Sequence, residues 1–201
     1  GSASTGSPPP TAPSTSTPTS PTSPTTRWRS RSVGSVAGAV LALIFVQMLA
    51  GALVAGLDAG MGFNTWPLIN GAFVPPGLGE SSPWYLNLFE NPLTVQFDHR
   101  MLGYLVVAAA PGQAMWLAFK RAPQVLIWSG STLALFAVLQ ATLGVWTLLL
   151  AVPITLGLAH QAGAIAVFAL ALHHRRDAGE VRLEPVLVLV HLRGDGEVPD
   201  H

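Results

Sequence analysis

The chain has 201 residues, of which half are hydrophobic and 10% are charged, and its formal net charge is zero. Because the charge is balanced and no basic stripe is present, the composition argues against a nucleic-acid partner. The chain contains no cysteine. This excludes disulfides, iron–sulfur clusters, thiolate ligands and thioether attachment of a haem.

Hydrophobic residues gather in four long runs, and the charged residues lie at the ends of these runs. Each run is close to or above the roughly 20 residues that a helix needs to cross a bilayer. The sequence therefore predicts an all-α fold, a polytopic membrane four-helix bundle. The runs cover residues 33–57, 94–119, 123–150 and 153–174.

The segments outside the runs are polar. Residues 1–26 contain only Gly, Ser, Ala, Thr and Pro, so they cannot bury enough apolar surface to offset the entropy of ordering. We expect three regions: a disordered segment over 1–32, a four-helix transmembrane bundle over 33–175 and a polar tail over 176–201. His173 and His174 are expected to cap the fourth helix and to join a charge cluster there.

Basic residues mark one side of the membrane. They flank the start of the first run, the turn at Lys120-Arg121 and the end of the fourth run, whereas the other two connections have none. Positively charged loops stay on the cytoplasmic side. We therefore expect both termini on the cytoplasmic side, or on the matrix side in an organelle. The connection over 58–93 carries several aromatic residues that fit an interfacial belt.

The four runs contain an internal repeat. The first run has Gln47 and, four residues on, Gly51; the third has Gln140 followed by Gly144 at the same spacing. The second and fourth runs each contribute one histidine with a glycine three or four residues later. This repeat predicts two pseudo-symmetric helical hairpins that face each other. The histidines and their glycines are His99 with Gly103 and His160 with Gly163.

The two histidines lie at matching depth. His99 follows Pro92 by seven residues and His160 follows Pro153 by seven, which places each side chain roughly 10 Å inside the outer end of its helix. Side chains on facing helices of a bundle can hold a cofactor between them. Two neutral imidazoles at one level could bind haem iron from both faces, so we predict His99 and His160 as axial ligands. Arg100 could then pair with a haem propionate.

Other interpretations remain open from the residues alone. A membrane histidine often makes a hydrogen bond between helices, and zinc usually requires three or four protein ligands. A proton relay through Asp98, His99 and Arg100 is possible, although pairing of Asp98 with Arg100 explains that carboxylate more simply. Gln47 and Gln140 could hydrogen-bond each other or contact the edge of a haem.

Several motifs together resemble the haem A synthase family. They recur in order with the family's spacing over about 33–175, and the resemblance is to the proteobacterial and mitochondrial cytochrome oxidase assembly type. The motifs are Ala-Gly-Leu-Asp-Ala-Gly (55–60), Asn-Thr-Trp-Pro (64–67), Phe-Glu-Asn-Pro (89–92), Gln-Phe-Asp-His-Arg (96–100), residues 140–149 and His-Gln-x-Gly (160–163).

The resemblance implies an oxidoreductase that converts the C8 methyl group of haem O to the formyl group of haem A for cytochrome oxidase. Family members have two four-helix halves, and the chain matches the C-terminal half. That half holds a b-type haem through two histidines, which correspond to His99 and His160. The substrate site would belong to the other half, so the catalytic residues of methyl oxidation are not assigned.

The resemblance also implies partners. These are haem O and haem A, membrane lipid, a separate N-terminal half or a second copy of the chain, and haem O synthase or cytochrome oxidase assembly factors. The membrane would be the bacterial cytoplasmic membrane or the mitochondrial inner membrane. The alternative function is a membrane b-type electron carrier without a substrate site, and a third is a haem-free assembly subunit.

Overall fold

The computed structural model of the chain describes Gly1 and residues 24–194, with side chains described over 32–181. In the described part, the regular structure is helical apart from an isolated bridge between Ile69 and Ala72. The elements in chain order are α1 (Pro24–Gly56), α2 (Ala59–Gly62), the 3-10 helix η1 (Trp84–Leu88), α3 (Pro92–Phe119), α4 (Gln124–Leu149) and α5 (Ile154–Gly194).

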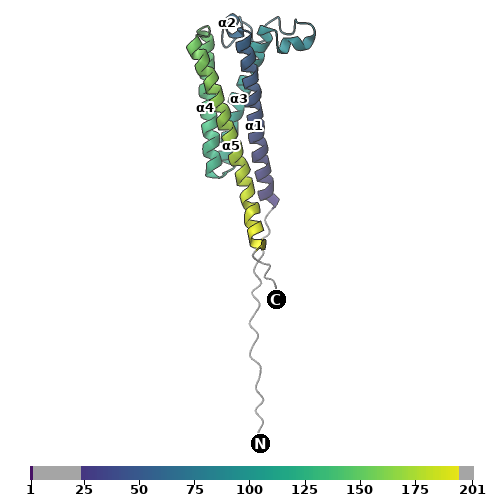
Figure 1. Cartoon of the computed structure of the whole chain (residues 1–201), viewed down its shortest axis with the longest axis vertical. Coiled ribbons are helices and arrows are strands. Elements are labelled where there is room, and N and C mark those ends of the chain that lie inside the picture. The colour runs from purple at the N-terminus through teal and green to yellow at the C-terminus, as the bar shows by residue number, and fades with distance from the viewer. Residues whose placement is uncertain (2–23, 195–201) are drawn as a thin grey trace.

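The four long helices form one bundle (Figure 1). Around it, α1 packs against α3, α3 against α4, α4 against α5, and α5 against α1. Successive long helices run in opposite directions, so α3 and α5 run the same way on diagonally opposite corners. The start of α1 and the end of α5 consequently lie at the same end of the bundle. Side chains from α3 and α5 can thus meet across its centre.

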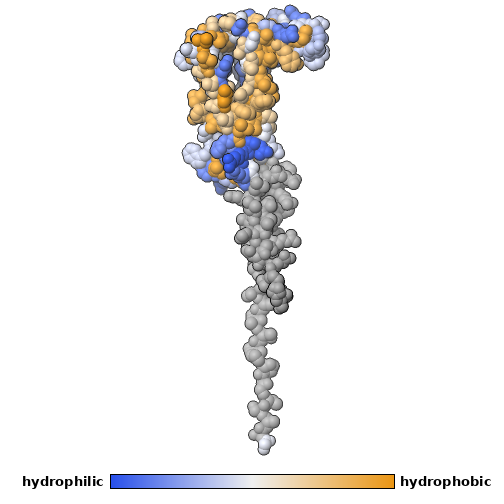
Figure 2. Space-filling model, viewed as in Figure 1, coloured by the Kyte–Doolittle hydropathy of each residue, from blue (hydrophilic) through white to orange (hydrophobic). Residues whose placement is uncertain are grey.

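All four helices are long and apolar enough to cross a membrane. The candidate spans are Ser32–Gly56, Pro92–Phe119, Gln124–Leu149 and Ile154–Val181. Figure 2 shows the corresponding hydrophobic band, with hydrophilic residues at both ends of the described bundle. The prediction of an all-α membrane four-helix bundle is confirmed.

Two helix boundaries differ from the prediction. The helix α1 begins at Pro24, so residues 24–32 of the segment predicted to be disordered are helical, while residues 2–23 lie outside the described chain. The helix α5 does not end at Arg176 but continues to Gly194. Across that predicted end, Arg176 Nε bonds Glu180 Oε1 at 2.7 Å, a pair four residues apart that stabilises helix. The C-terminal residues 195–201 of the predicted tail are not described.

The start of α3 is fixed by its own sequence. The side-chain oxygen of Asn91 accepts hydrogen bonds from the backbone N–H of Leu93 and of Thr94, at 3.1 and 3.2 Å. Pro92 occupies the first helical position, where a missing N–H costs nothing. Because the cap defines where α3 begins, it also defines the depth of His99 and Arg100 about two turns into the helix.

The apolar core occupies the part of the bundle away from α2 and η1. A cluster of buried small and branched side chains from all four long helices forms it. Nearer α2, the side chains of two histidines and two glutamines lie against glycines of neighbouring helices, alongside buried apolar residues such as Val95 and Leu148. The fold therefore separates a packed apolar segment from a polar segment nearer α2. The core cluster comprises Val40, Ile44, Val106, Ala110, Leu133, Ala134, Ala137, Val167 and Ala171.

Candidate functional site

Each of the two predicted ligand histidines packs against a glycine of the neighbouring helix. A Cβ built on Gly51 of α1 would lie 3.0 Å from Cε1 of His99 on α3. A Cβ built on Gly144 of α4 would lie 2.6 Å from Cε1 of His160 on α5. Both distances are shorter than ordinary contacts, so the rings take the space that a side chain at either position would need.

The two glutamines pack in the opposite direction, from α1 and α4 against glycines of α3 and α5. The side chain of Gln47 on α1 lies against Gly103 of α3, where a Cβ would be 3.2 Å from Nε2. The side chain of Gln140 on α4 lies still closer to Gly163 of α5. The repeat seen in the sequence is therefore a repeat in space, since α1 with α3 and α4 with α5 exchange the same pairs of side chains.

Hydrogen bonding differs between the two halves. Gln140 Nε2 lies 3.0 Å from His160 Nδ1 and donates to the His160 carbonyl oxygen at 2.6 Å. In the other half, Gln47 Oε1 and His99 Nδ1 are both buried without a hydrogen-bond partner. Gln140 thus bonds a histidine. Of the two possibilities that the sequence left open, a hydrogen bond between Gln47 and Gln140 is not formed among the described residues, and contact with the edge of a haem stays a prediction.

The two histidines converge on the interior from diagonal helices. Each ring also lies against the backbone of the glutamine one turn before its glycine, His99 against Gln47 and His160 against Gln140. The rings are near enough to interact electrostatically with each other. The structure therefore brings together the two residues that the sequence paired by depth.

Arg100 is a buried cation with free donors. It is 8% exposed, and its Nη2 donates to the Phe63 carbonyl oxygen at 2.7 Å. Its Nε and Nη1 are buried without partners. The predicted pairing with Asp98 is wrong, because residues two positions apart point in different directions from a helix. Ion pairs in the described chain join His173 with Asp177 and Arg176 with Glu180.

The donor set fits a haem. Two imidazoles face the interior, and a buried guanidinium offers two free nitrogen donors, Nε and Nη1, of the kind that bind carboxylates. Among residues 32–181, no three side chains of His, Cys, Asp or Glu come together as metal ligands. A tetrahedral zinc site would therefore lack ligands, whereas haem iron needs only two axial positions from the protein.

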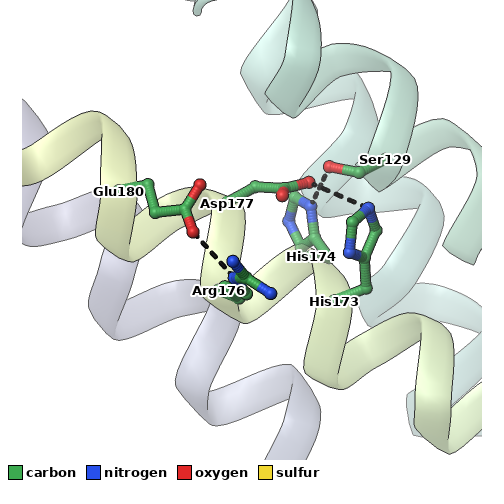
Figure 3. Close-up of polar contacts among 6 residues, drawn as sticks. All are labelled: Ser129, His173, His174, Arg176, Asp177 and Glu180. Atoms are coloured by element: carbon green, nitrogen blue, oxygen red, sulfur yellow. Dashed lines mark hydrogen bonds and ion pairs between the residues drawn. The ribbon is translucent and has the colours of Figure 1, made fainter.

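A third histidine site, which the sequence interpretation missed, lies in the half of the bundle away from α2. Figure 3 shows its histidine, His174, beside Ser129. His174 is 1% exposed, and its Nε2 lies 2.8 Å from Gln113 Nε2 while its Nδ1 lies 2.8 Å from Ser129 Oγ. The expected capping role is wrong for His173 and His174, since α5 continues past both. His173 is exposed and lies 3.7 Å from Asp177.

One signal in the sequence could have revealed this site. His174 follows His160 by 14 residues, which is close to four helical turns, so both side chains leave nearly the same face of α5. Its ring also packs on a glycine, because a Cβ on Gly130 would lie 3.3 Å from its Cε1. The pattern of a histidine over a glycine of α4 therefore occurs twice along α5.

Comparisons with known proteins give a consistent result. The sequence pattern of a family described as cytochrome oxidase assembly protein matches residues 12–172. Heme A synthase of Parvibaculum lavamentivorans is 48% identical over 142 residues, which are 71% of this chain and 40% of that protein. Heme A synthase of Rhodopseudomonas palustris strain BisB5 is 53% identical over 137 residues, 66% of this chain and 37% of that protein.

Heme A synthase of Nitrosomonas eutropha is 46% identical over 134 residues, 65% of this chain and 36% of that protein. No solved structure matches the chain significantly. The chain spans about 40% of the length of the first of these curated relatives. With a family pattern that covers most of its residues, the chain belongs to the cytochrome oxidase assembly protein family that includes the haem A synthases.

Proposed function

We propose that this chain is the b-haem-binding part of a haem A synthase, with His99 and His160 as the axial ligands. The observation that carries the proposal is the repeated arrangement of the two rings. Each comes from one of two diagonal helices, packs on a glycine of the neighbouring helix and lies against the backbone of a glutamine one turn away. Such a pair of imidazoles suits six-coordinate haem iron.

Three further side chains would complete the haem pocket. The free Nε and Nη1 of Arg100 would bind a propionate, and its bond to the Phe63 carbonyl oxygen would hold the guanidinium in place. The amides of Gln47 and Gln140 would border the macrocycle beside the histidines. A bound b haem would supply one-electron transfer, with a potential set by its ligands, burial and hydrogen bonds.

The activity proposed for the whole enzyme is oxidation of the C8 methyl group of haem O to the formyl group of haem A. Support comes from the relatives, whose printed name is Heme A synthase. Because the chain spans about 40% of the length of the first of them, we assign methyl oxidation to a second half or a second copy. This half would pass electrons away from haem O. Haem O synthase and oxidase assembly factors are the proposed partners.

The proposed orientation places the start of α1, the turn between α3 and α4 and the end of α5 on the cytoplasmic or matrix side. Lys120 and Arg121 in that turn are exposed, and Arg176 lies at the same end on α5. The positive-inside rule supports this side for all of them. The haem would then lie nearer the outer surface of a bacterial cytoplasmic or mitochondrial inner membrane.

The test is a reduced-minus-oxidised absorption spectrum of the detergent-purified chain made with haem available. We expect a low-spin b-type spectrum that His99→Ala and His160→Ala each abolish or convert to high spin. His173→Ala, which alters an exposed histidine on α5, is the matched control and should leave the spectrum unchanged. A haem-free wild-type chain would refute the ligand assignment.

The enzymatic part needs a separate assay. The chain would be combined with haem O and a candidate second half, and the haem extracted and separated to measure conversion to haem A. Conversion that depends on His99 and His160 supports the synthase. Redox cycling of a b haem without conversion would instead favour a membrane electron carrier.

A further inference from the structure

Arg175 of α5 lies between the first and the last of the four long helices, at the end of the bundle where α1 begins. Its side chain packs along α1, where a Cβ built on Gly38 would lie 3.3 Å from Nε and one on Gly34 would lie 4.0 Å from Nη1. A Cβ on Gly179, one turn further along α5, would lie 3.7 Å from the same Nη1. Three glycines thus adjoin the guanidinium, so none of these positions carries a side chain that could cover its donors.

The guanidinium has no acceptor within the described chain. Arg175 is partly buried and takes part in none of the hydrogen bonds or ion pairs found among the described side chains. The two nearby acidic residues of α5 have other partners. Asp177 lies 3.7 Å from His173, and Glu180 Oε1 accepts a hydrogen bond from Arg176 Nε at 2.7 Å (Figure 3). Because α1 contains no acidic residue, an anion for Arg175 has to come from outside the described chain.

The depth of this arginine corresponds to the membrane boundary. It lies six residues, about 9 Å, before the end of the candidate span Ile154–Val181. That span has 28 residues and measures about 42 Å, whereas the hydrocarbon core of a bilayer is about 30 Å thick. Each end of a centred span therefore projects roughly 6 Å into the headgroup region. A long arginine side chain near such an end extends towards the headgroups.

Apolar side chains continue along the same two helices towards the centre of the membrane. Phe168 precedes Arg175 by seven residues, and Phe45 follows Gly38 by seven, so each lies about two turns away on nearly the same helical face. The two phenyl rings are in contact, with centroids 5.9 Å apart. Phe45 is 49% exposed, and Leu172, between Phe168 and Arg175, is 46% exposed. A cation above exposed apolar side chains matches the phosphate and the acyl chain of a phospholipid.

The charge at this end of the bundle favours an anionic lipid. The described side chains there include four basic residues against two acidic ones, and Figure 2 shows the resulting hydrophilic surface below the hydrophobic band. The first turns of α1 add three arginines over residues 27–31. Basic residues at a membrane surface attract anionic lipids, and arginine can bind a phosphate through two parallel N–H donors. The basic residues are Lys120, Arg121, Arg175 and Arg176, and the acidic residues are Asp177 and Glu180.

We propose that Arg175 binds the phosphate of an anionic phospholipid, one acyl chain of which lies along Phe45, Phe168 and Leu172. The lipid joins the first and the last spans of the bundle, since α1 contributes the glycines and α5 the arginine. The site is independent of the haem assignment, because the apolar core separates it from the candidate haem ligands.

The test measures lipid binding by native mass spectrometry. The full chain is purified in a neutral detergent, freed of lipid and mixed with phosphatidylglycerol as the anionic probe or phosphatidylcholine as the neutral one. We expect the wild type to prefer phosphatidylglycerol. Arg175→Gln should weaken that binding about 10-fold or more, as expected for loss of hydrogen bonds to a charged group. Arg175→Lys should be intermediate, because a single ammonium lacks the paired donors.

Arg176→Gln is the matched control, since it removes the same charge from an exposed neighbour. It should weaken binding by no more than about fivefold, the effect of one surface charge. Equal losses in Arg175→Gln and Arg176→Gln would overturn the proposed site in favour of a diffuse attraction. Equal binding of both lipids by the wild type would overturn it as well, and this comparison does not depend on the folding of a variant. Complete displacement of phosphatidylglycerol by inorganic phosphate would assign the site to a free anion and refute the lipid.

Discussion

At the scale of single residues, the candidate site depends on two glycines, which have no side chain. Gly51 and Gly144 leave space that the rings of His99 and His160 occupy. Alanine is normally the more favourable residue in a helix interior, by about 1 kcal/mol. A loss of haem on adding a methyl group there would therefore report displacement of the ring and not a weaker helix.

We predict that Gly144→Ala impairs haem binding more than Gly51→Ala. The new methyl carbon would lie 2.6 Å from His160 Cε1 in the first variant and 3.0 Å from His99 Cε1 in the second. Forcing extra atoms into a packed site typically costs about 1–3 kcal/mol. Haem affinity and the low-spin fraction of the spectrum measure the effect. Gly112→Ala is the control, since nothing lies within 4 Å of that position; equal losses in all three variants would contradict the prediction.

Arg100 provides a second test at this scale. Its buried Nε and Nη1 have no protein partner, and a hydrogen bond between charged groups contributes about 1.5–3 kcal/mol. We predict that Arg100→Gln weakens haem binding by roughly that amount and that Arg100→Lys, which keeps the charge but not the fork of donors, is intermediate. The measurement is again haem affinity. Dimethyl-ester haem, which lacks the propionate charge, should bind the wild type and Arg100→Gln about equally; a preserved difference would contradict the propionate assignment.

At the scale of the helices, His174 joins three of them. Its ring on α5 bonds Gln113 of α3 and Ser129 of α4, and it is almost completely buried. The apolar core separates it from the candidate haem site, and the 14 residues between His174 and His160 correspond to about 21 Å along the helix. Its contribution should therefore be to stability and not to haem ligation.

We predict that His174→Ala lowers the free energy of unfolding by about 3 kcal/mol, because it leaves a cavity and two buried polar groups without partners. His173→Ala should change it by less than about 1 kcal/mol, since its ion pair with Asp177 is largely exposed on the histidine side. Unfolding in mixed micelles measures both. The haem spectrum of His174→Ala should match the wild type, and a haem loss equal to that of His160→Ala would contradict the separation of the two sites.

The helices could be predicted because length, hydropathy and residue spacing within each segment are enough to indicate them. Length and hydropathy place the first three spans and the start of the fourth within a few residues. The spacing of Gln47 with Gly51 and of Gln140 with Gly144 indicates the two hairpins. The sequence does not predict the continuation of α5 past Arg176, because basic residues such as those at 173–176 are typical of the last turn of a helix. In the structure, Arg176 and Glu180 pair at four-residue spacing and sustain the helix.

The contacts that could not be predicted depend on how the helices are rotated against each other. His174 lies 61 residues from Gln113 and 45 from Ser129, and no spacing along the chain shows that the three would meet. The bond of Arg100 to the Phe63 carbonyl oxygen, 37 residues away, is of the same kind. Proximity in sequence favours a pair between Asp98 and Arg100, whereas side chains two positions apart on a helix point in different directions.

At the scale of the whole molecule, the decisive property is orientation in the membrane. The start of α1 and the end of α5 lie at one end of the bundle, with the turn between α3 and α4, while α2 and η1 lie at the other. If the basic end faces the cytoplasm or matrix, the polar interior around His99 and His160 is closer to the outer surface. The side of the membrane to which the proposed haem site is closer follows from this choice.

We predict that a cysteine replacing Lys120 reacts with a membrane-impermeant maleimide only from the inner side, and one replacing Trp84 only from the outer side. Both positions are exposed, with Trp84 74% accessible. Trp84 lies in η1 just before the start of α3 and Lys120 directly follows the end of α3, so the two flank opposite ends of that helix. The chain has no cysteine of its own, so each variant carries a single reactive thiol. Labelling of intact and of inverted vesicles gives the answer. Reaction of Lys120→Cys from the outside would contradict the proposed topology. The proposed haem site would then lie in the inner half of the membrane.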